Sequence, residues 1–200
     1  MRAILAASNP RATLVPVTTT LVLAGVHTPV SRYAESLLPG DGTRVLRPVA
    51  DGADPALSPT ISTVTAPALD STPQGWVAED STDLVRSILY SRNAVAVDNL
   101  PAWVTGKITA ADAWEAPEKA AAVVTDASLE LAALLSALPY DAVVISCELG
   151  LMVAADTPID RALQDALGQA NTVLSNHLSR AVLLLGGRAV DLSAFPALPY

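Results

Sequence analysis

The sequence predicts an α/β domain with a mainly parallel sheet covered by helices on both faces. Short apolar, β-branched stretches alternate with segments of helical periodicity, which is typical of parallel strands joined by crossover helices. The chain has 200 residues, 51% of them hydrophobic, enough to bury a core without cross-links. We expect one domain over residues 18–192, after an irregular lead-in of residues 1–17 and before a C-terminal tail of residues 193–200.

Each expected strand is a short run of apolar or β-branched residues. The last two runs flank Gly186-Gly187 and predict a hairpin at one edge of the sheet. Two of the others end on an acid, Asp98 and Glu148. The expected strands cover residues 18–24, 45–46, 94–98, 141–148, 181–185 and 189–192.

The expected helices follow start signals and apolar residues at three- and four-residue steps. A Thr-Pro pair precedes the first and the last of them, with Thr as the cap and Pro at the first helical position. Asp80 or Ser81 is expected to cap the second helix. The helices are expected over residues 28–37, 81–89, 103–108, 117–136 and 157–178.

The segment from Pro48 to Gly75 differs from the rest of the chain. It holds five prolines among Asp, Ser, Thr and Ala, and neither a helical nor an alternating period. We predict a long loop that runs over the surface.

Composition excludes several classes of function. The net charge is −8, and Lys107 and Lys119 are the only lysines, which argues against binding to nucleic acid or anionic lipid. Cys147 is the only cysteine, so no intrachain disulfide forms and a cysteine-based zinc site is excluded; we interpret Cys147 as small core filler. Every apolar run is too short to span a membrane, and we expect a cytoplasmic protein.

Ligands of such sheets bind at the carboxyl ends of the strands. The turn after Ala24 is where a phosphate-binding loop of pattern G-x-x-x-x-G-K-[ST] would lie. Only the hydroxyl position of that pattern is kept, at Ser31. Ala24 and Pro29 replace the two glycines and Val30 replaces the lysine. By these residues alone, an ordinary strand–helix turn is favoured over a working phosphate loop.

Four motifs in order resemble the bifunctional adenosylcobinamide kinase/adenosylcobinamide-phosphate guanylyltransferase family of cobalamin biosynthesis. Each motif is weak alone, and their order over most of residues 18–192 makes the resemblance specific. They are T-L-V-L-A-G with S-R-Y-A-E at 20–35, V-D-N-L with Trp103, E-L-G-L at 148–151, and D-A-L-G-Q-A-N at 165–171.

The resemblance implies a three-layer P-loop-type (RecA-like) α/β fold that is usually trimeric and acts on a corrinoid. It also implies two reactions. The first phosphorylates the aminopropanol hydroxyl of adenosylcobinamide with GTP or ATP and Mg²⁺. The second transfers GMP to that phosphate through a guanylylated histidine just after the second strand.

This chain departs from the family at both reactions. The loop lacks its lysine, and no histidine occurs between His27 and His177. The Pro-rich segment 48–75 stands where the histidine-bearing helix should be. Covalent catalysis needs the nucleophilic atom itself, so we predict a degenerate member that has lost both steps. It would act by binding a corrinoid intermediate, a weakly held nucleotide, or an active relative in a mixed oligomer; a homo-oligomer is also expected.

An alternative hypothesis keeps the kinase step. Ser31 and Asp98 would hold Mg²⁺, and Arg32, Arg44 or Arg47 would cover the phosphates. For Asp98 and Glu148 a structural role as strand-end or turn acids stays open, and for Asp165 and Asn171 an inter-helix or subunit hydrogen bond is favoured. Trp76, Trp103 and Trp114 are core or interface anchors. The candidate nucleotide-binding residues are Gly25, His27, Thr28, Ser31, Arg32, Asp98 and Glu148, with Ser31 and Asp98 as the metal ligands.

Overall fold

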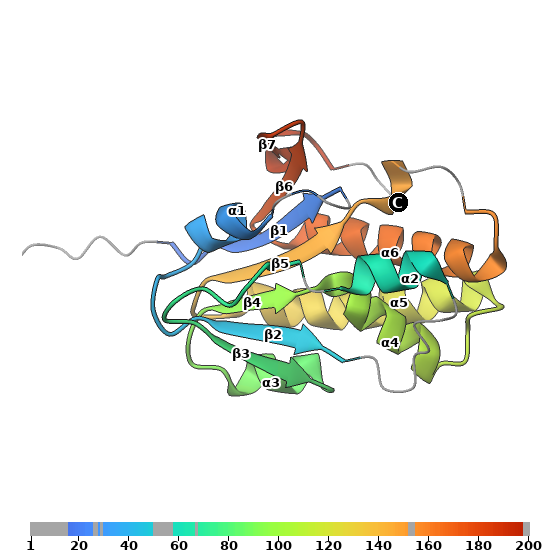
Figure 1. Cartoon of the computed structure of the whole chain (residues 1–200), viewed down its shortest axis with the longest axis horizontal. Helices are drawn as coiled ribbons and strands as arrows, with labels where there is room; N and C mark the ends of the chain where they lie inside the picture. The colour runs from blue at the N-terminus through green and yellow to red at the C-terminus, as the bar shows by residue number, and fades with distance from the viewer. Residues whose placement is uncertain are drawn as a thin grey trace, which may run out of the picture.

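The computed structural model describes residues 16–25, 28, 30–49, 58–66, 68–151 and 155–197. Seven strands form one sheet in the order β3-β2-β4-β5-β1-β6-β7 (Figure 1). All neighbours are parallel except β6 and β7, which form the antiparallel edge hairpin expected around Gly186-Gly187. The strands are β1 (Thr19–Ala24), β2 (Arg44–Pro48), β3 (Val77–Ser81), β4 (Val95–Asp98), β5 (Ala142–Cys147), β6 (Arg180–Leu185) and β7 (Arg188–Asp191).

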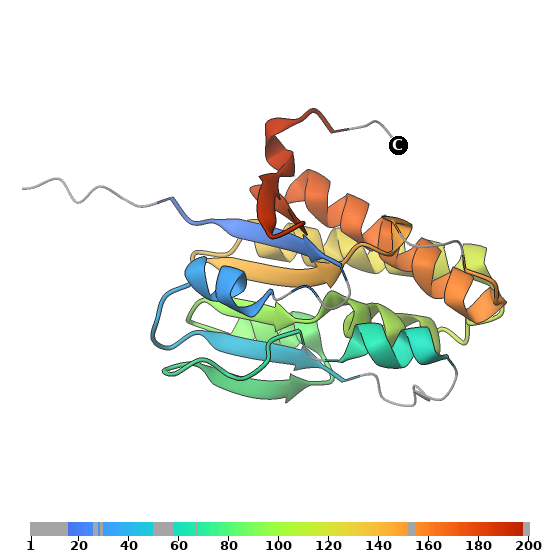
Figure 2. The same cartoon turned by 45° about the horizontal axis from the view of Figure 1, so that its top comes forward.

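Helices cover both faces of the sheet, as the sequence predicts. Figures 1 and 2 show α5 and α6 side by side on one face and α1 on the other. The helices are α1 (Ser31–Ser36), α2 (Pro59–Thr65), α3 (Leu84–Tyr90), α4 (Leu100–Ala110), α5 (Pro117–Ser136) and α6 (Pro158–His177), with 3₁₀ turns η2 (Leu149–Leu151) and η3 (Leu192–Ala194).

Alternation along the central strands divides the core into two layers. Leu21 and Leu23 of β1 pack in the cluster that includes α3 to α6. Val22 and Ala24 pack in the opposite cluster, with α1, Leu69 and Trp76. Since successive side chains of a strand point to opposite faces, β1 is buried on both sides. The central strands therefore separate two layers of core, one on each face of the sheet.

The first helix starts later than predicted. Its N-cap is Val30, which makes no capping side-chain hydrogen bond. The backbone N–H of Thr28 instead donates to the carbonyl of Gly25 (3.0 Å), which closes a turn before the helix. The prediction of a helix capped by Thr28 is therefore wrong. Residues 26, 27 and 29 lie outside the described residues.

The Pro-rich segment 48–75 is not a loop throughout, because it contains α2. Ser58 caps this helix through a hydrogen bond from the N–H of Thr60 to its Oγ (3.0 Å). Ile61 and Val64 are buried in the core. Proline at the first turn starts a helix rather than breaking it, and Pro59 holds that place. Residues 50–57 and 67 lie outside the described residues.

The stretch before α3 also corrects the sequence analysis. Residues Val77–Ser81 form β3, so neither Asp80 nor Ser81 caps the helix. Asp83 does, accepting a hydrogen bond from the N–H of Arg86 (3.0 Å). β3 is an edge strand, and its V-A-E-D-S sequence lacks the apolar run that marks the buried strands.

The remaining elements agree with the prediction. α5 spans Pro117–Ser136, and Thr157 caps α6 by accepting a hydrogen bond from the N–H of Asp160 (3.1 Å). α4 begins at Leu100 instead of Trp103 because Asn99 caps it. In the part of the chain that the structure describes, no helix has the length and apolarity to cross a membrane.

Two of the three tryptophans are core anchors. Trp76 is buried, and its indole Nε1 donates to the carbonyl of Pro39 (3.0 Å). Trp103 is buried with the ammonium of Lys107 5.5 Å from its ring centroid. Trp114 is half-buried and donates to Thr109 Oγ1 (3.1 Å).

Candidate functional site

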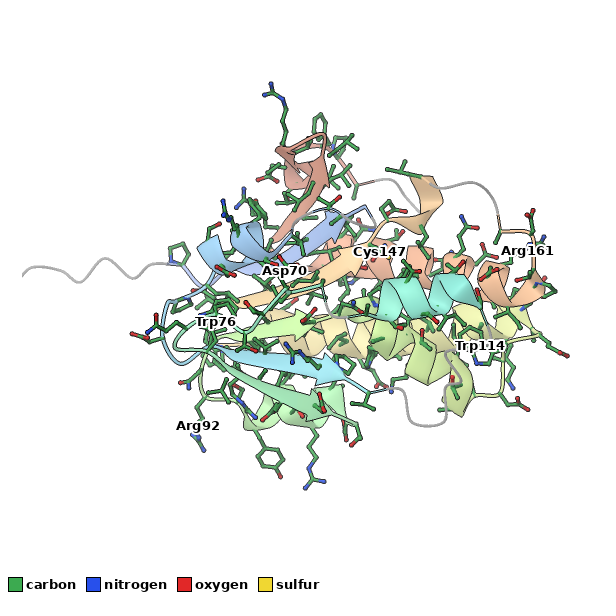
Figure 3. All side chains as sticks on the ribbon, viewed as in Figure 1. Asp70, Trp76, Arg92, Trp114, Cys147 and Arg161 are labelled. Atoms are coloured by element: carbon green, nitrogen blue, oxygen red, sulfur yellow. The ribbon has the colours of Figure 1, made fainter. Side chains whose placement is uncertain are left out.

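A cavity of about 490 Å³ lies at the carboxyl ends of β1, β4 and β5. This is where ligands bind in parallel α/β sheets. Figure 3 labels Asp70 and Cys147, which line it from two separate parts of the chain. The described lining residues with polar side chains are Thr28, Thr63, Asp70, Asn99, Ser146 and Cys147, and Gly25 also lines the cavity.

Ser31 contacts Asp70 rather than the predicted metal partner. Its Oγ donates to Asp70 Oδ2 (3.2 Å) and accepts from the backbone N–H of Asp70 (3.1 Å). Ser31 is the first residue of α1 and is buried. Its hydroxyl therefore fixes the segment that follows α2 against the start of α1.

Asp98 holds the same segment from the end of β4. Its Oδ1 accepts from the backbone N–H of Ala68 (2.6 Å) and of Leu69 (3.4 Å). Its Oδ2 is buried, accepts no hydrogen bond within the described residues, and lies 3.7 Å from the Nε of Arg47. Burial raises the pKa of this carboxyl, against the opposing effects of the two backbone N–H groups and of Arg47.

Asn99 adds a third attachment. Its Nδ2 donates to the carbonyls of Val64 (3.1 Å) and Ala66 (2.7 Å), while its Oδ1 accepts from the N–H of Ala102 and caps α4. Together Ser31, Asp98 and Asn99 bind the chain from the end of α2 to Asp70. We call residues 64–66 and 68–70 the strap.

The three arginines proposed for phosphate binding do not converge on the cavity. Arg44 is the first residue of β2, at the amino end of the strand, and pairs with Glu79. Arg47 faces Asp98. Arg32 is exposed on α1 and makes no ion pair within the described residues.

Glu148 belongs to a different cavity. Its Oε1 accepts from the N–H of Gly150 (2.8 Å), which makes it a turn acid. It lines a second hollow, of about 550 Å³, between α6 and the C-terminal residues, with Asn176 and Phe195. The sequence places it with the nucleotide-binding candidates, but the structure separates it from the cavity that Gly25 and Thr28 line.

Asn171 is buried and joins α6 to the end of β5. Its Oδ1 accepts from Ser146 Oγ (2.6 Å) and its Nδ2 donates to the carbonyl of Cys147 (2.9 Å). The prediction of an inter-helix or subunit hydrogen bond for Asn171 is wrong, because both bonds link α6 to β5. Cys147 lines the cavity, and burial, with a smaller effect of the Glu148 charge, raises the pKa of its thiol to about 12. Asp165 is exposed on α6.

Four of the residues predicted from the sequence therefore lie near one another, and two further residues of the site were not predicted. Gly25 and Thr28 line the cavity, and Ser31 and Asp98 hold its strap. His27 lies outside the described residues. Asn99 was missed although a capping residue three positions before Ala102, with proline at the first turn, is a recognisable signal. Asp70 was missed because it belongs to no motif.

A comparison with models of protein families shows to which family this chain belongs. The model for cobinamide kinase / cobinamide phosphate guanyltransferase matches residues 20–192, from β1 to the start of η3. The chain belongs to this family. The resemblance predicted from the motifs is confirmed, and with it a P-loop-type α/β fold. A search of curated proteins found none that matches this chain.

Membership in the cobinamide kinase/guanyltransferase family implies a kinase/guanyltransferase-like role in cobalamin biosynthesis. It also makes GTP or ATP a plausible ligand and points to corrinoids as the other ligand class. The residues of this chain do not fit Mg²⁺ with a triphosphate at Ser31 and Asp98. One oxygen of Asp98 accepts two backbone hydrogen bonds and the other faces the cation of Arg47, while Ser31 is bound to Asp70. The described residues also hold no group of three His, Cys, Asp or Glu side chains placed to bind a metal ion.

Proposed function

We propose that this chain is a non-catalytic member of the cobinamide kinase/guanyltransferase family and acts by binding a ligand in the cavity at the ends of β1, β4 and β5. One observation carries the proposal. Ser31 and Asp98, the residues that would hold Mg²⁺, are both hydrogen bonded to the strap. The chain's own backbone and carboxylate therefore take up the bonds that a metal and its phosphates would need.

The charge of the cavity supports the same conclusion. Phosphoryl transfer depends on cations placed around the transferred group. Among the described lining residues none is a lysine or arginine, and Asp70 is an acid. The loop sequence from Ala24 to Ser31 contains no lysine or arginine either. A triphosphate in this cavity would meet the carboxylate of Asp70, and Val30 stands where the family's pattern has a lysine.

The position of the lost nucleophile points the same way. α2 occupies the place after the second strand where the family's guanylylated histidine belongs, and its residues are Pro, Thr, Ile, Ser, Thr, Val and Thr. The helix has no histidine, and its serine and threonine hydroxyls are weak nucleophiles unless an adjacent base activates them. Guanylyl transfer is therefore lost together with phosphorylation.

Transfer assays with the purified protein test the proposal. Adenosylcobinamide is incubated with radiolabelled GTP or ATP and Mg²⁺, and adenosylcobinamide phosphate is incubated with GTP. A family member with an intact loop lysine and histidine serves as the positive control under the same conditions. We expect label transfer by the control and none by this chain, at enzyme concentrations that would reveal a rate 10⁴-fold lower.

Two outcomes would contradict the proposal. Phosphorylation of adenosylcobinamide that disappears in Asp98→Asn would establish the alternative kinase, with Asp98 as a metal ligand. Transfer of GMP to adenosylcobinamide phosphate would show that another nucleophile has replaced the histidine. The variant Glu79→Gln, whose carboxyl pairs with Arg44 at the opposite end of the sheet, controls for loss of activity through instability.

A further inference from the structure

We propose that the cavity selects a phosphate-free ligand that carries a cationic group, and that Asp70 is the residue that recognises this group. The inference rests on the proposed function, because it names the class of ligand that the same cavity binds. The proposed preference of the cavity for a cation is the opposite of that of a phosphate loop, which binds anions through backbone N–H groups and a lysine.

Asp70 is the only residue with a formal charge among the described residues of the cavity. It is exposed, so a ligand can reach it. Its orientation is fixed, because Ser31 Oγ donates to Oδ2 and the backbone N–H of Asp70 donates back to Ser31. A carboxylate held in this way offers its acceptor oxygens to a donor in the cavity without a large loss of side-chain freedom.

Two other polar side chains of the cavity, Asn99 and Ser146, are already paired within the protein. The amide of Asn99 bonds the strap and caps α4. The hydroxyl of Ser146 donates to Asn171. Since these groups are committed, they add little to the recognition of a phosphate, and Asp70 dominates the electrostatics of the site.

A second acid, Glu148, lies next to the wall of the cavity. Glu148 follows Cys147 directly and raises the pKa of its thiol, so its negative charge is felt at the wall of the cavity. Arg47 lies beside Asp98, and no described lysine or arginine lines the cavity. An anion would therefore enter against the local field, and a cation would enter with it.

The remaining wall is apolar and suits an organic body. Ala24, Val30, Val64 and Ile145 line the cavity, and its volume of about 490 Å³ falls in the range of small-molecule sites. A ligand with a ring system against these side chains and an ammonium at Asp70 would satisfy both parts of the cavity.

Three nucleosides that differ only in their 5′ group test the charge preference directly. The probes are 5′-amino-5′-deoxyadenosine, adenosine and AMP, which at pH 7 carry a cationic, a neutral and an anionic group. Calorimetric titration of the full chain gives the dissociation constant of each. We expect the amine to bind about tenfold more tightly than adenosine, and AMP to bind more weakly than adenosine.

Variants assign the preference to Asp70. Asp70→Asn should remove the advantage of the amine over adenosine and leave adenosine binding within about twofold, whereas Asp70→Glu should keep most of that advantage. Asp165→Asn, at an exposed position of α6 outside the cavity, should change neither the advantage of the amine nor the affinity for adenosine. Circular dichroism of each variant establishes that it is folded before titration.

Three results would overturn the inference: tightest binding of AMP, an amine preference that survives in Asp70→Asn, or binding of none of the three probes. None of these results depends on turnover. They are therefore distinct from the transfer assays, in which catalysis would contradict the proposed function whatever the ranking of the nucleosides.

Discussion

Ser31 and Asp70 exchange two hydrogen bonds, although 39 residues separate them in the sequence. Ser31 opens α1, and Asp70 follows α2 and the strap. In a phosphate loop a hydroxyl at the position of Ser31 would bind a metal ion. Here the hydroxyl of Ser31 binds the carboxylate of Asp70, and this bond holds Asp70 at the cavity between the ends of β1, β4 and β5.

Replacement of Ser31 tests this structural role. Ser31→Ala removes both hydrogen bonds with Asp70 at a buried position, so we expect the free energy of unfolding to fall by about 1 kcal/mol and Tm by about 2–4 °C. Urea and thermal unfolding measure the change. Ser36→Ala, at an exposed position of the same helix, is the matched control and should stay within about 0.5 kcal/mol of the parent chain. Equal losses in the two variants would contradict a specific role for Ser31.

Asn99 is expected to matter more than Ser31. Asn99→Ala leaves the carbonyls of Val64 and Ala66 without their donor and removes the cap of α4. We expect a loss of about 2–4 kcal/mol in the free energy of unfolding. Hydrogen exchange should also quicken in α2 and in the first turn of α4. Asn93→Ala, at an exposed position before β4, is the control; a loss no larger than that of the control would mean that the strap is held by other contacts.

The parts of the fold that the sequence predicts are those whose signals are local. β1, β4 and β5 are buried on both faces along almost their whole length, so they appear in the sequence as mainly apolar runs. α5 and α6 begin at a proline and are long enough to repeat their apolar stripe several times. β3 lies at an edge with most of its residues exposed or half-buried, so no apolar run marks it.

The parts of the site that the sequence does not predict depend on contacts between distant residues. In the alternative kinase hypothesis, Ser31 and Asp98 share a Mg²⁺ ion. The strap changes this arrangement, because Asp98 binds the backbone 29 and 30 residues before it. No motif in the sequence around Asp70 predicts its hydrogen bonds with Ser31. Such a pairing is set by where α2 packs, and that is a tertiary property.

The buried carboxyl of Asp98 predicts a specific dependence of stability on pH. Its pKa in the folded chain is raised above the reference value of 3.8. The folded state therefore holds this proton more tightly than the unfolded state. The contribution of Asp98 to stability falls as the pH rises from about 4 through the raised folded pKa, and is lowest above it.

Asp98→Asn removes this titration while keeping an oxygen that can accept from Ala68 and Leu69. We expect the stability of Asp98→Asn relative to the parent chain to increase from pH 4 to neutral pH, as measured by urea unfolding. For Asp191→Asn we expect the opposite trend: its stability relative to the parent chain should decrease from acid to neutral pH. The hydrogen bond from Arg180 lowers the pKa of Asp191, so its stabilising effect is present above 3.8 and is lost in acid. A difference in stability between the parent chain and Asp98→Asn that does not change with pH would contradict a raised pKa of the buried Asp98 carboxyl.

Cys147 offers a chemical measure of the cavity wall, because it is the only cysteine of the chain. Burial and the charge of Glu148 raise the pKa of its thiol from 9.0 to about 12. The thiolate is the reactive form, so at pH 8 alkylation by iodoacetamide should be slower than that of a cysteine in an unfolded chain by about two to three orders of magnitude.

Mass spectrometry of the intact protein over time gives the alkylation rate, with the urea-unfolded chain as the reference. The rate in the folded protein should continue to rise up to pH 10 without levelling off. Glu148→Gln should increase it modestly, because it removes the smaller of the two causes of the shift and keeps an oxygen for the N–H of Gly150. A rate that levels off near pH 9 and matches the unfolded chain would show instead that Cys147 meets solvent freely. The cavity wall at the end of β5 would then be more open than the hydrogen bonds of Asn171 to Ser146 and Cys147 indicate.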